Sequence, residues 1–132
     1  MSEVVLTLSV LTERLAVCRL DAHSVIPTWA TGGSFLSATR TSDQLSVVCP
    51  ERDVPADVKC ERGWRAFKIE GPFDFASTGI LAAVAGPLAA AEVSILAIAT
   101  YDTDYILVNE SQLERAACVL SAHGHTVHGH EH

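Results

Sequence analysis

The chain has 132 residues, of which 48% are hydrophobic and 19% are charged. This length and composition suffice for one packed domain or for two very small ones. The formal net charge of −7 at pH 7 argues against binding to nucleic acid or anionic membranes, because both need a basic face and the nine Lys and Arg residues are scattered.

Four strands are predicted in the first half, because apolar and polar residues alternate there between turns. They cover residues 4–10, 15–20, 34–39 and 45–49. Between the second and third strands, Pro27 and Gly32-Gly33 leave room for a short helix at most. Residues 50–62 are charged and contain two prolines, so we interpret them as a linker.

The second half opens with a predicted strand over residues 64–70, and a helix capped by Ser77 or Thr78 follows to about residue 90. Four apolar residues share one face of this helix: Ile80, Val84, Leu88 and Ala91. Pro87 removes one backbone hydrogen bond from the helix and is expected to bend it.

Two aliphatic strands, residues 93–99 and 104–108, come next. Ser111 and Glu114 have the spacing of a capping box for a last helix, and Gly124 is a suitable end for it. A short final strand over residues 126–128 completes the order βαββαβ. This order predicts an α+β, ferredoxin-like module with a four-stranded antiparallel sheet and both helices on one face.

The four cysteines, Cys18, Cys49, Cys60 and Cys118, show no C-x-x-C spacing, so neither a zinc knuckle nor a dithiol redox motif is visible. We expect buried, reduced thiols in a cytoplasmic protein, since Cys18 and Cys118 lie in apolar runs. The spacing also allows a bridge between Cys49 and Cys60.

The N-terminus has no basic region, and Glu13 and Arg14 interrupt its apolar run, so no signal peptide is expected. Residues 80–98 have the length of a membrane span. Gly86-Pro87 and Glu92 interrupt that run and argue against one.

The sequence contains an internal similarity between two predicted hairpins. Residues 38–47, ATRTSDQLSV, align without gaps on residues 99–108, ATYDTDYILV. Two unrelated hairpins would explain this pattern, but flanking strands in the same order favour a duplication. The first copy then has a stunted first helix and no clear second one.

Three segments carry a resemblance to a known family: Gly79-Ile80, residues 85–91 (AGPLAAA) and residues 99–108. They resemble the pattern G-I, a-G-P-L-A and S-T-x-x-x-D-x-x-L-V of the ACT-domain family, with Ala99 where the family often has Ser. The likeness is to tandem ACT proteins of the kind found among arginine sensors and in the paired modules of aspartate kinases. It implies tandem ferredoxin-like modules, a degenerate one with its linker in residues 1–60 and a second in residues 61–132.

The resemblance implies a non-catalytic module that binds an amino acid and acts as a homodimer. In this family the ligand contacts come from the loop entering the first helix and from the strand turn opposite. The matching residues are Ser77, Thr78, Gly79, Ile80, Leu81, Thr100, Tyr101, Asp102, Thr103 and Asp104.

The chemistry of these residues suits a small zwitterion. Exposed amides at the helix start would bind a carboxylate, and Gly79 would let the backbone come close to it. Asp102 and Asp104 would bind the ammonium group, Thr100 and Thr103 would add hydroxyls, and Tyr101 would cover an aliphatic stem. Asp and Thr are also ordinary hairpin residues, so turn formation alone accounts for them, and only the resemblance favours a ligand site.

The arginine sensor has a second acidic residue just before the matching helix start. Here residues 75–77 contain none, and the nearest acid is Asp74. We therefore expect a smaller or neutral amino acid rather than arginine.

Five of the six histidines lie near the C-terminus: His123, His125, His128, His130 and His132. In an extended chain His128, His130 and His132 point the same way and have the ligand chemistry for Zn²⁺, Ni²⁺ or Cu²⁺. A frayed terminus orients no ligand, however, so a solvated tail is the simpler interpretation.

No nucleophile–base pair or phosphate-binding glycine loop is present in the sequence, and carboxylates in a hairpin turn would be solvated and ionised. We therefore predict a cytoplasmic, non-enzymatic amino-acid sensor without a cofactor, which forms a homodimer, regulates a protein partner in trans and binds neither nucleic acid nor membrane. The alternatives are a metal-binding protein that uses the tail, and a structural association module with a vestigial pocket.

Overall fold

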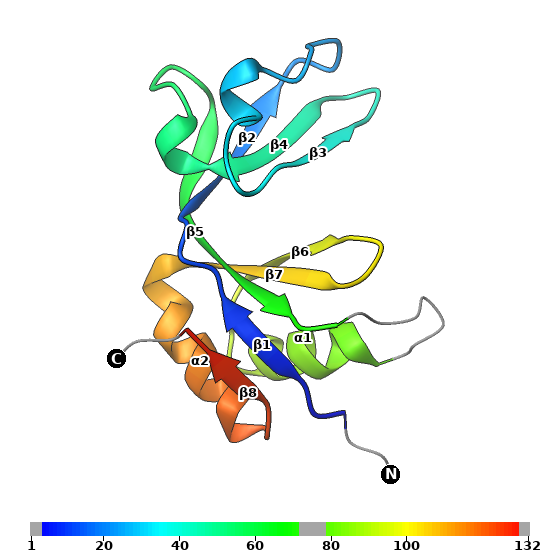
Figure 1. Cartoon of the computed structure of the whole chain (residues 1–132), viewed down its shortest axis with the longest axis vertical. Helices are drawn as coiled ribbons and strands as arrows, with labels where there is room; N and C mark the ends of the chain where they lie inside the picture. The colour runs from blue at the N-terminus through cyan, green and yellow to red at the C-terminus, as the bar shows by residue number, and fades with distance from the viewer. Residues whose placement is uncertain (1–3, 72–78, 130–132) are drawn as a thin grey trace. The chain divides into compact units, whose positions relative to one another are not determined.

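The computed structural model describes residues 4–71 and 79–129. The chain divides into two compact units, one of Glu13–Trp64 and one that combines Met1–Thr12 with Arg65–His132 (Figure 1). This division differs from the expected modules of residues 1–60 and 61–132, because the first strand pairs within the C-terminal unit.

The C-terminal unit contains the elements of a βαββαβ module in the expected order. They are β5 (Cys60–Ile69), α1 (Ile80–Ala90), β6 (Ile95–Ala99), β7 (Asp104–Asn109), η3 (Glu110–Gln112), α2 (Leu113–Ala122) and β8 (Thr126–His128). The strand order is β6-β7-β5-β1-β8, so β1 (Thr7–Val10) lies between β5 and β8. Strand β1 is antiparallel to β5 and parallel to β8, and the expected four-stranded, wholly antiparallel sheet was wrong in this respect.

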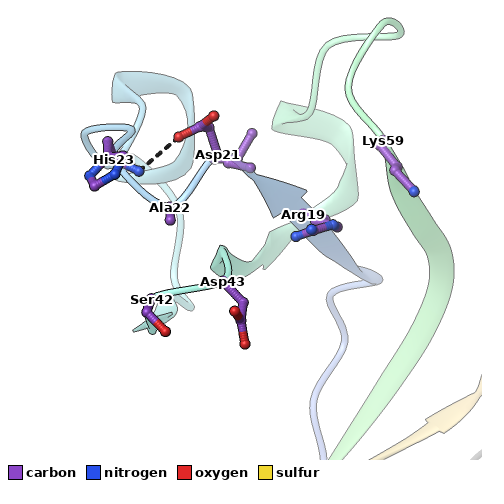
Figure 2. Close-up of a pocket in the computed structure, with 8 residues that line it drawn as sticks. Arg19, Asp21, Ala22, His23, Ser42, Asp43 and Lys59 are labelled. Atoms are coloured by element: carbon purple, nitrogen blue, oxygen red, sulfur yellow. Dashed lines mark hydrogen bonds between the residues drawn. The ribbon is translucent and has the colours of Figure 1, made fainter.

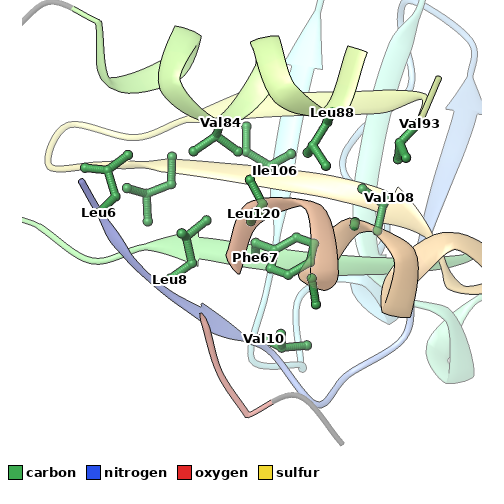
Figure 3. Packing of buried hydrophobic residues seen from close by; sticks show 13 residues of the cluster. Leu6, Leu8, Val10, Phe67, Val84, Leu88, Val93, Ile106, Val108 and Leu120 are labelled. Atoms are coloured by element: carbon green, nitrogen blue, oxygen red, sulfur yellow. The ribbon is translucent and has the colours of Figure 1, made fainter. Parts of the chain in front are cut away.

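Alternation along the strands builds the core of this unit (Figure 3). Leu8 of β1, Phe67 of β5 and Ile106 of β7 are fully buried and lie on one face of the sheet. The helices cover this face with buried residues, of which Val84, Leu88 and Leu120 are the largest.

The N-terminal unit has β2 (Leu15–Leu20), η1 (Thr28–Ala30), β3 (Ser37–Arg40), β4 (Leu45–Pro50), η2 (Glu51–Asp53) and the first part of β5. Its strand order is β3-β4-β2-β5, and its pairings are antiparallel. The segment interpreted as a linker, residues 50–62, instead contains the end of β4, η2 and the start of β5. Strand β5 begins early because Cys60 and Glu61 pair with β2.

Both units have the same sequence of elements. The order β2-η1-β3-β4-η2-β5 matches β5-α1-β6-β7-α2-β8, with three-residue 3₁₀ turns where the second set has α-helices. In both units the spatial order is second, third, first and fourth strand, and β1 is the additional strand of the C-terminal unit. Strand β5 is therefore the fourth strand of one set and the first strand of the other.

A β-bulge divides β5 between its two roles. The pairing register shifts between Leu15–Trp64 and Val17–Glu61, which places one extra residue on β5. Gly63, in this stretch, has φ +83°, a left-handed conformation that favours glycine. The boundary between the two units follows directly, between Trp64 and Arg65.

The helix termini correct two details of the sequence analysis. The capping box of Ser111 and Glu114 is wrong, since the Asn109 side chain accepts from the Ser111 N–H at 3.0 Å and η3 precedes α2. Cys118 is exposed rather than buried, because α2 directs Ala117 and Leu120 to the core instead. The end at Gly124, which has φ +93°, and the final strand are confirmed.

His125 compensates for the proline in α1. Pro87 has no N–H to donate to the carbonyl of Ala83, four residues earlier. The Nε2–H of His125 donates to that carbonyl at 3.0 Å, while its Nδ1 accepts from the Leu6 N–H at 3.1 Å. His125 is only 6% exposed, so it belongs to the structure of this unit and not to a solvated tail.

The variant His125→Leu should destabilise the protein, because it leaves the Leu6 N–H and the Ala83 carbonyl without these partners. We expect the free energy of unfolding to fall by about 2–4 kcal/mol, measured by urea denaturation. His123→Leu is the matched control, since His123 is exposed and its Nδ1 lies 3.0 Å from the Val119 carbonyl of α2. A loss of at most about 1 kcal/mol is expected there. Equal losses in the two variants would contradict the role of His125.

Candidate functional site

The predicted binding residues of the β6–β7 hairpin form a tight turn. The Thr100 N–H donates to the Thr103 carbonyl at 2.8 Å, and the Thr103 N–H donates to Thr100 Oγ1 at 3.2 Å. Asp104 is already in β7, paired with Ala99. The two threonines therefore have a structural role in the turn, as hairpin propensity alone predicts.

The β3–β4 hairpin of the N-terminal unit has the same turn. The Thr41 N–H donates to the Gln44 carbonyl at 2.9 Å, and the Gln44 N–H donates to Thr41 Oγ1 at 3.3 Å. Thr41 thus corresponds to Thr100, and Asp43 corresponds to Asp102. The gapless sequence alignment, which matched Asp43 to Asp104, is displaced by two residues from this structural register.

A small hollow lies beside the turn of the C-terminal unit. Its volume is about 200 Å³, and it is lined by Lys68, Gly71, Asp102 and Thr103. Thr103 is only 8% exposed, and its hydroxyl donates to the carbonyl of Ile69 near the end of β5. This contact fixes the turn against the strand that supplies Lys68, so a carboxylate and an ammonium group line the same space.

None of the other predicted site residues that the structure describes lines this hollow. Gly79 has φ +80° at the start of α1, so its conformation requires glycine independently of any ligand. Ile80 packs against the core and Leu81 is 41% exposed. Tyr101 is 79% exposed. Ser77 and Thr78 lie outside the described residues.

A larger hollow lies at the corresponding place in the N-terminal unit (Figure 2). Its volume is about 460 Å³. Charged and polar side chains from the end of β2, the following loop, the β3–β4 turn and the start of β5 line it: Arg19, Asp21, His23, Ser42, Asp43 and Lys59. Arg19 Nη1 donates to Gln44 Oε1 at 3.2 Å, which holds the guanidinium near the turn.

The two hollows share a pair of opposite charges. Arg19 and Lys68 are each the penultimate residue of the first strand of their set, and Asp43 and Asp102 each occupy the third position of the turn. Sequence analysis missed both cations. Alternation along the strands could have identified them. Lys68 lies between the buried residues Phe67 and Ile69, so its side chain must point to the opposite face of the sheet.

The histidines give no metal site in the part of the chain that the structure describes. No group of three or more His, Cys, Asp or Glu residues that could hold a metal ion occurs within residues 4–71 and 79–129. His128 is exposed on β8, and His130 and His132 are outside these ranges. Among the described residues, no helix is long and apolar enough to cross a membrane.

Comparisons with known proteins identify both parts of the chain. A family model described as an ACT domain matches residues 59–122, and a model of an N-terminal domain matches residues 13–57. The "Cytosolic arginine sensor for mTORC1 subunit 1" of Mus musculus is 32% identical over 113 residues, covering 75% of this chain and 33% of the relative. The chain therefore spans about a third of the length of such curated relatives.

Solved structures agree with the fold. A crystal structure of a protein from Agobacterium tumefaciens has 40% identity and a TM-score of 0.89, covering 98% of both chains. The regulatory subunit of aspartate kinase from Thermus flavus has a TM-score of 0.64 at 7% identity, covering 92% of this chain and 99% of that one. Because the identity to the Thermus flavus subunit is only 7%, this similarity shows the fold alone.

The variant Thr103→Val should test how firmly the turn is fixed to β5. Valine keeps the volume of the side chain but removes the hydroxyl that donates to the Ile69 carbonyl. We expect the free energy of unfolding to fall by about 1–2 kcal/mol in urea denaturation. Thr126→Val, on the exposed side of β8, is the control and should change it by less than about 0.5 kcal/mol. Equal stability of the two variants would show that the hydroxyl contributes nothing.

Proposed function

Because the chain belongs to the ACT-domain family, with its ACT domain in residues 59–122, we propose that it is a non-catalytic regulator that binds an α-amino acid. The observation that carries this proposal is the pair of opposite charges in each hollow. The cation, Lys68 or Arg19, would bind the ligand carboxylate, and Asp102 or Asp43 would bind its ammonium group.

Two features support a tandem arrangement of ACT modules. Both sets of elements follow the same order along the chain and in their sheets, and both hairpins end in a turn with the same hydrogen bonds. We propose that residues 13–64 form a degenerate module in which η1 and η2 replace the two helices. In this proposal the ligand site of each module lies between its first strand and its central hairpin.

A small or neutral amino acid fits the C-terminal hollow better than arginine does. Of the described residues that line it, only Asp102 carries a carboxylate, and the ligand ammonium would occupy that group. A guanidinium would then find no second carboxylate among those residues, and it would lie near Lys68, whose Nζ is 3.8 Å from a carboxylate oxygen of Glu70. The acid that precedes the first helix in the arginine sensor is also absent from residues 75–77 of the sequence.

The loop entering α1 remains part of the proposed site. Strand β5 leads through Gly71, which lines the hollow, toward Ser77 and Thr78, the residues that the family resemblance assigns to the ligand. We propose that these residues, with Gly79, Ile80 and Leu81, contact the ligand together with Thr100, Tyr101, Asp102, Thr103 and Asp104.

A thermal-shift screen against the standard amino acids tests the proposal, because a ligand that binds only the folded state raises the unfolding midpoint. For the best ligand, Asp102→Asn or Asp43→Asn should raise the dissociation constant, measured by calorimetry, about tenfold or more. The reason is that a charge-assisted hydrogen bond is worth about 1.5–3 kcal/mol. Glu114→Gln, an exposed change on α2, should leave it unaltered. The sensor proposal fails if no amino acid shifts the midpoint at millimolar concentration.

We also propose that the protein acts as a cytoplasmic homodimer and regulates a partner protein in trans. Helix α1 supports the dimer, because Ile80–Ala90 contains no charged residue and yet exposes Leu81. An uncharged helix of this kind is usually covered by another surface.

Leu81→Glu should place a charge in the proposed dimer interface and give a monomer in size-exclusion chromatography with light scattering. Leu36→Glu is the matched control, because Leu36 is 42% exposed, as Leu81 is at 41%. We expect the control to elute with the wild-type mass. A monomeric wild-type protein at high concentration would contradict the homodimer.

A further inference from the structure

Three of the four cysteines lie together in the N-terminal unit. Cys18 is in β2, Cys49 in β4 and Cys60 at the start of β5, and all three are free thiols. Cys18 and Cys49 are buried, whereas Cys60 is only partly buried. The Cys18 thiol is in hydrogen-bonding contact with the thiols of both Cys60 and Cys49.

Cys18 and Cys60 have the geometry of a cross-strand disulfide pair. They lie directly opposite each other on the antiparallel strands β2 and β5. The next pair along, Arg19 and Lys59, is joined by a backbone hydrogen bond of 3.0 Å, so Cys18 and Cys60 occupy a non-hydrogen-bonded position. At such positions the Cα atoms are about 4.5 Å apart, within the range of about 4.4–6.8 Å that disulfides span.

Cys49 is placed less well for either partner. It lies opposite Ala16, two residues along β2 from Cys18, and such diagonal neighbours are about 7–8 Å apart. Cys49 and Cys60 are on strands separated by β2, hence roughly 10 Å apart. The bridge between Cys49 and Cys60 that the sequence spacing allowed is therefore wrong.

We propose that Cys18 and Cys60 form a reversible disulfide by exchange with a small-molecule disulfide such as oxidised glutathione. The Cys60 thiolate, the more accessible of the two, attacks one glutathione sulfur and displaces the other glutathione as its thiolate. The Cys18 thiolate then attacks Cys60 Sγ and displaces the second glutathione. The two protein thiols lose two protons and two electrons in total, and one glutathione disulfide becomes two glutathione thiols.

The burial of Cys18 makes the second step slow at neutral pH. Desolvation, with the neighbouring Cys49 and Cys60, raises the pKa of the Cys18 thiol to about 12. The thiolate is the attacking species, so its fraction, and with it the rate of the second step, should rise about tenfold per pH unit below that value. The pair thus resists brief exposure to oxidant and closes under sustained or alkaline oxidation.

The test uses the whole protein carrying Cys118→Ser, which removes the exposed thiol. It is treated with oxidised glutathione, blocked with iodoacetamide and analysed by intact mass and peptide mapping. We expect the loss of two hydrogens, a linked peptide pair containing Cys18 and Cys60, and full reversal by dithiothreitol. The conversion of the glutathione adduct to the bridge should accelerate about tenfold from pH 7 to pH 8.

Cys49→Ser is the matched control and should still form the bridge, whereas Cys18→Ser should stop at a stable glutathione adduct on Cys60. The mapping of the parent protein decides the question even if a variant folds poorly. The proposal is overturned if the folded protein gives only adducts, or if Cys18 becomes linked to Cys49 instead.

Discussion

The imidazole of His125 joins three segments of the C-terminal unit that are far apart in sequence. Its Nε2–H donates to the Ala83 carbonyl that Pro87 leaves without a helical partner, and its Nδ1 accepts from the N–H of Leu6. The left-handed turn at Gly124 delivers His125 to this position, and the next residue donates from its N–H to the Leu6 carbonyl at 2.9 Å. Strand β8 then pairs in parallel with β1. The extra strand, the proline-containing helix and the end of α2 thus depend on one neutral side chain.

Strand β5 belongs to both sets of elements, because it is the last strand of one set and the first strand of the next. Lys59, the residue just before β5, lines the larger hollow, and Lys68, near the end of β5, lines the smaller one. The bulge at Gly63 lies between Lys59 and Lys68 and bends the strand locally. The two sets of elements therefore share one strand, and both keep a cation at the same position of their first strand.

The sequence predicted the fold well wherever a local pattern determines it. Alternating strands, the apolar face of α1 and the stop at Gly124 all follow from local periodicity and backbone preference. The pairing of β1 in the C-terminal unit could not be predicted, because long-range partners are chosen by burial and not by the strand's own pattern. For the same reason the structural role of His125 could not be predicted, since its hydrogen-bond partners are 119 and 42 residues away in the sequence. Of the residues that line the two hollows, Asp102 and Thr103 were among those predicted to bind a ligand, whereas the cations on β2 and β5 were not, because strand propensity carries no information about function.

In the two hairpins, the residues that match in the sequence alignment are not the residues that occupy the same positions of the turn. The gapless alignment maximised matching letters and equated Asp43 with Asp104. The backbone instead repeats a turn that starts with threonine, since a hydroxyl at that position accepts the N–H three residues later in both copies. This constraint fixes the third turn position, which is aspartate in each hairpin, above the end of the first strand. The carboxylate that lines each hollow is therefore positioned by turn geometry, so the same feature explains the ordinary turn propensity of these residues and the role in ligand binding that we propose for them.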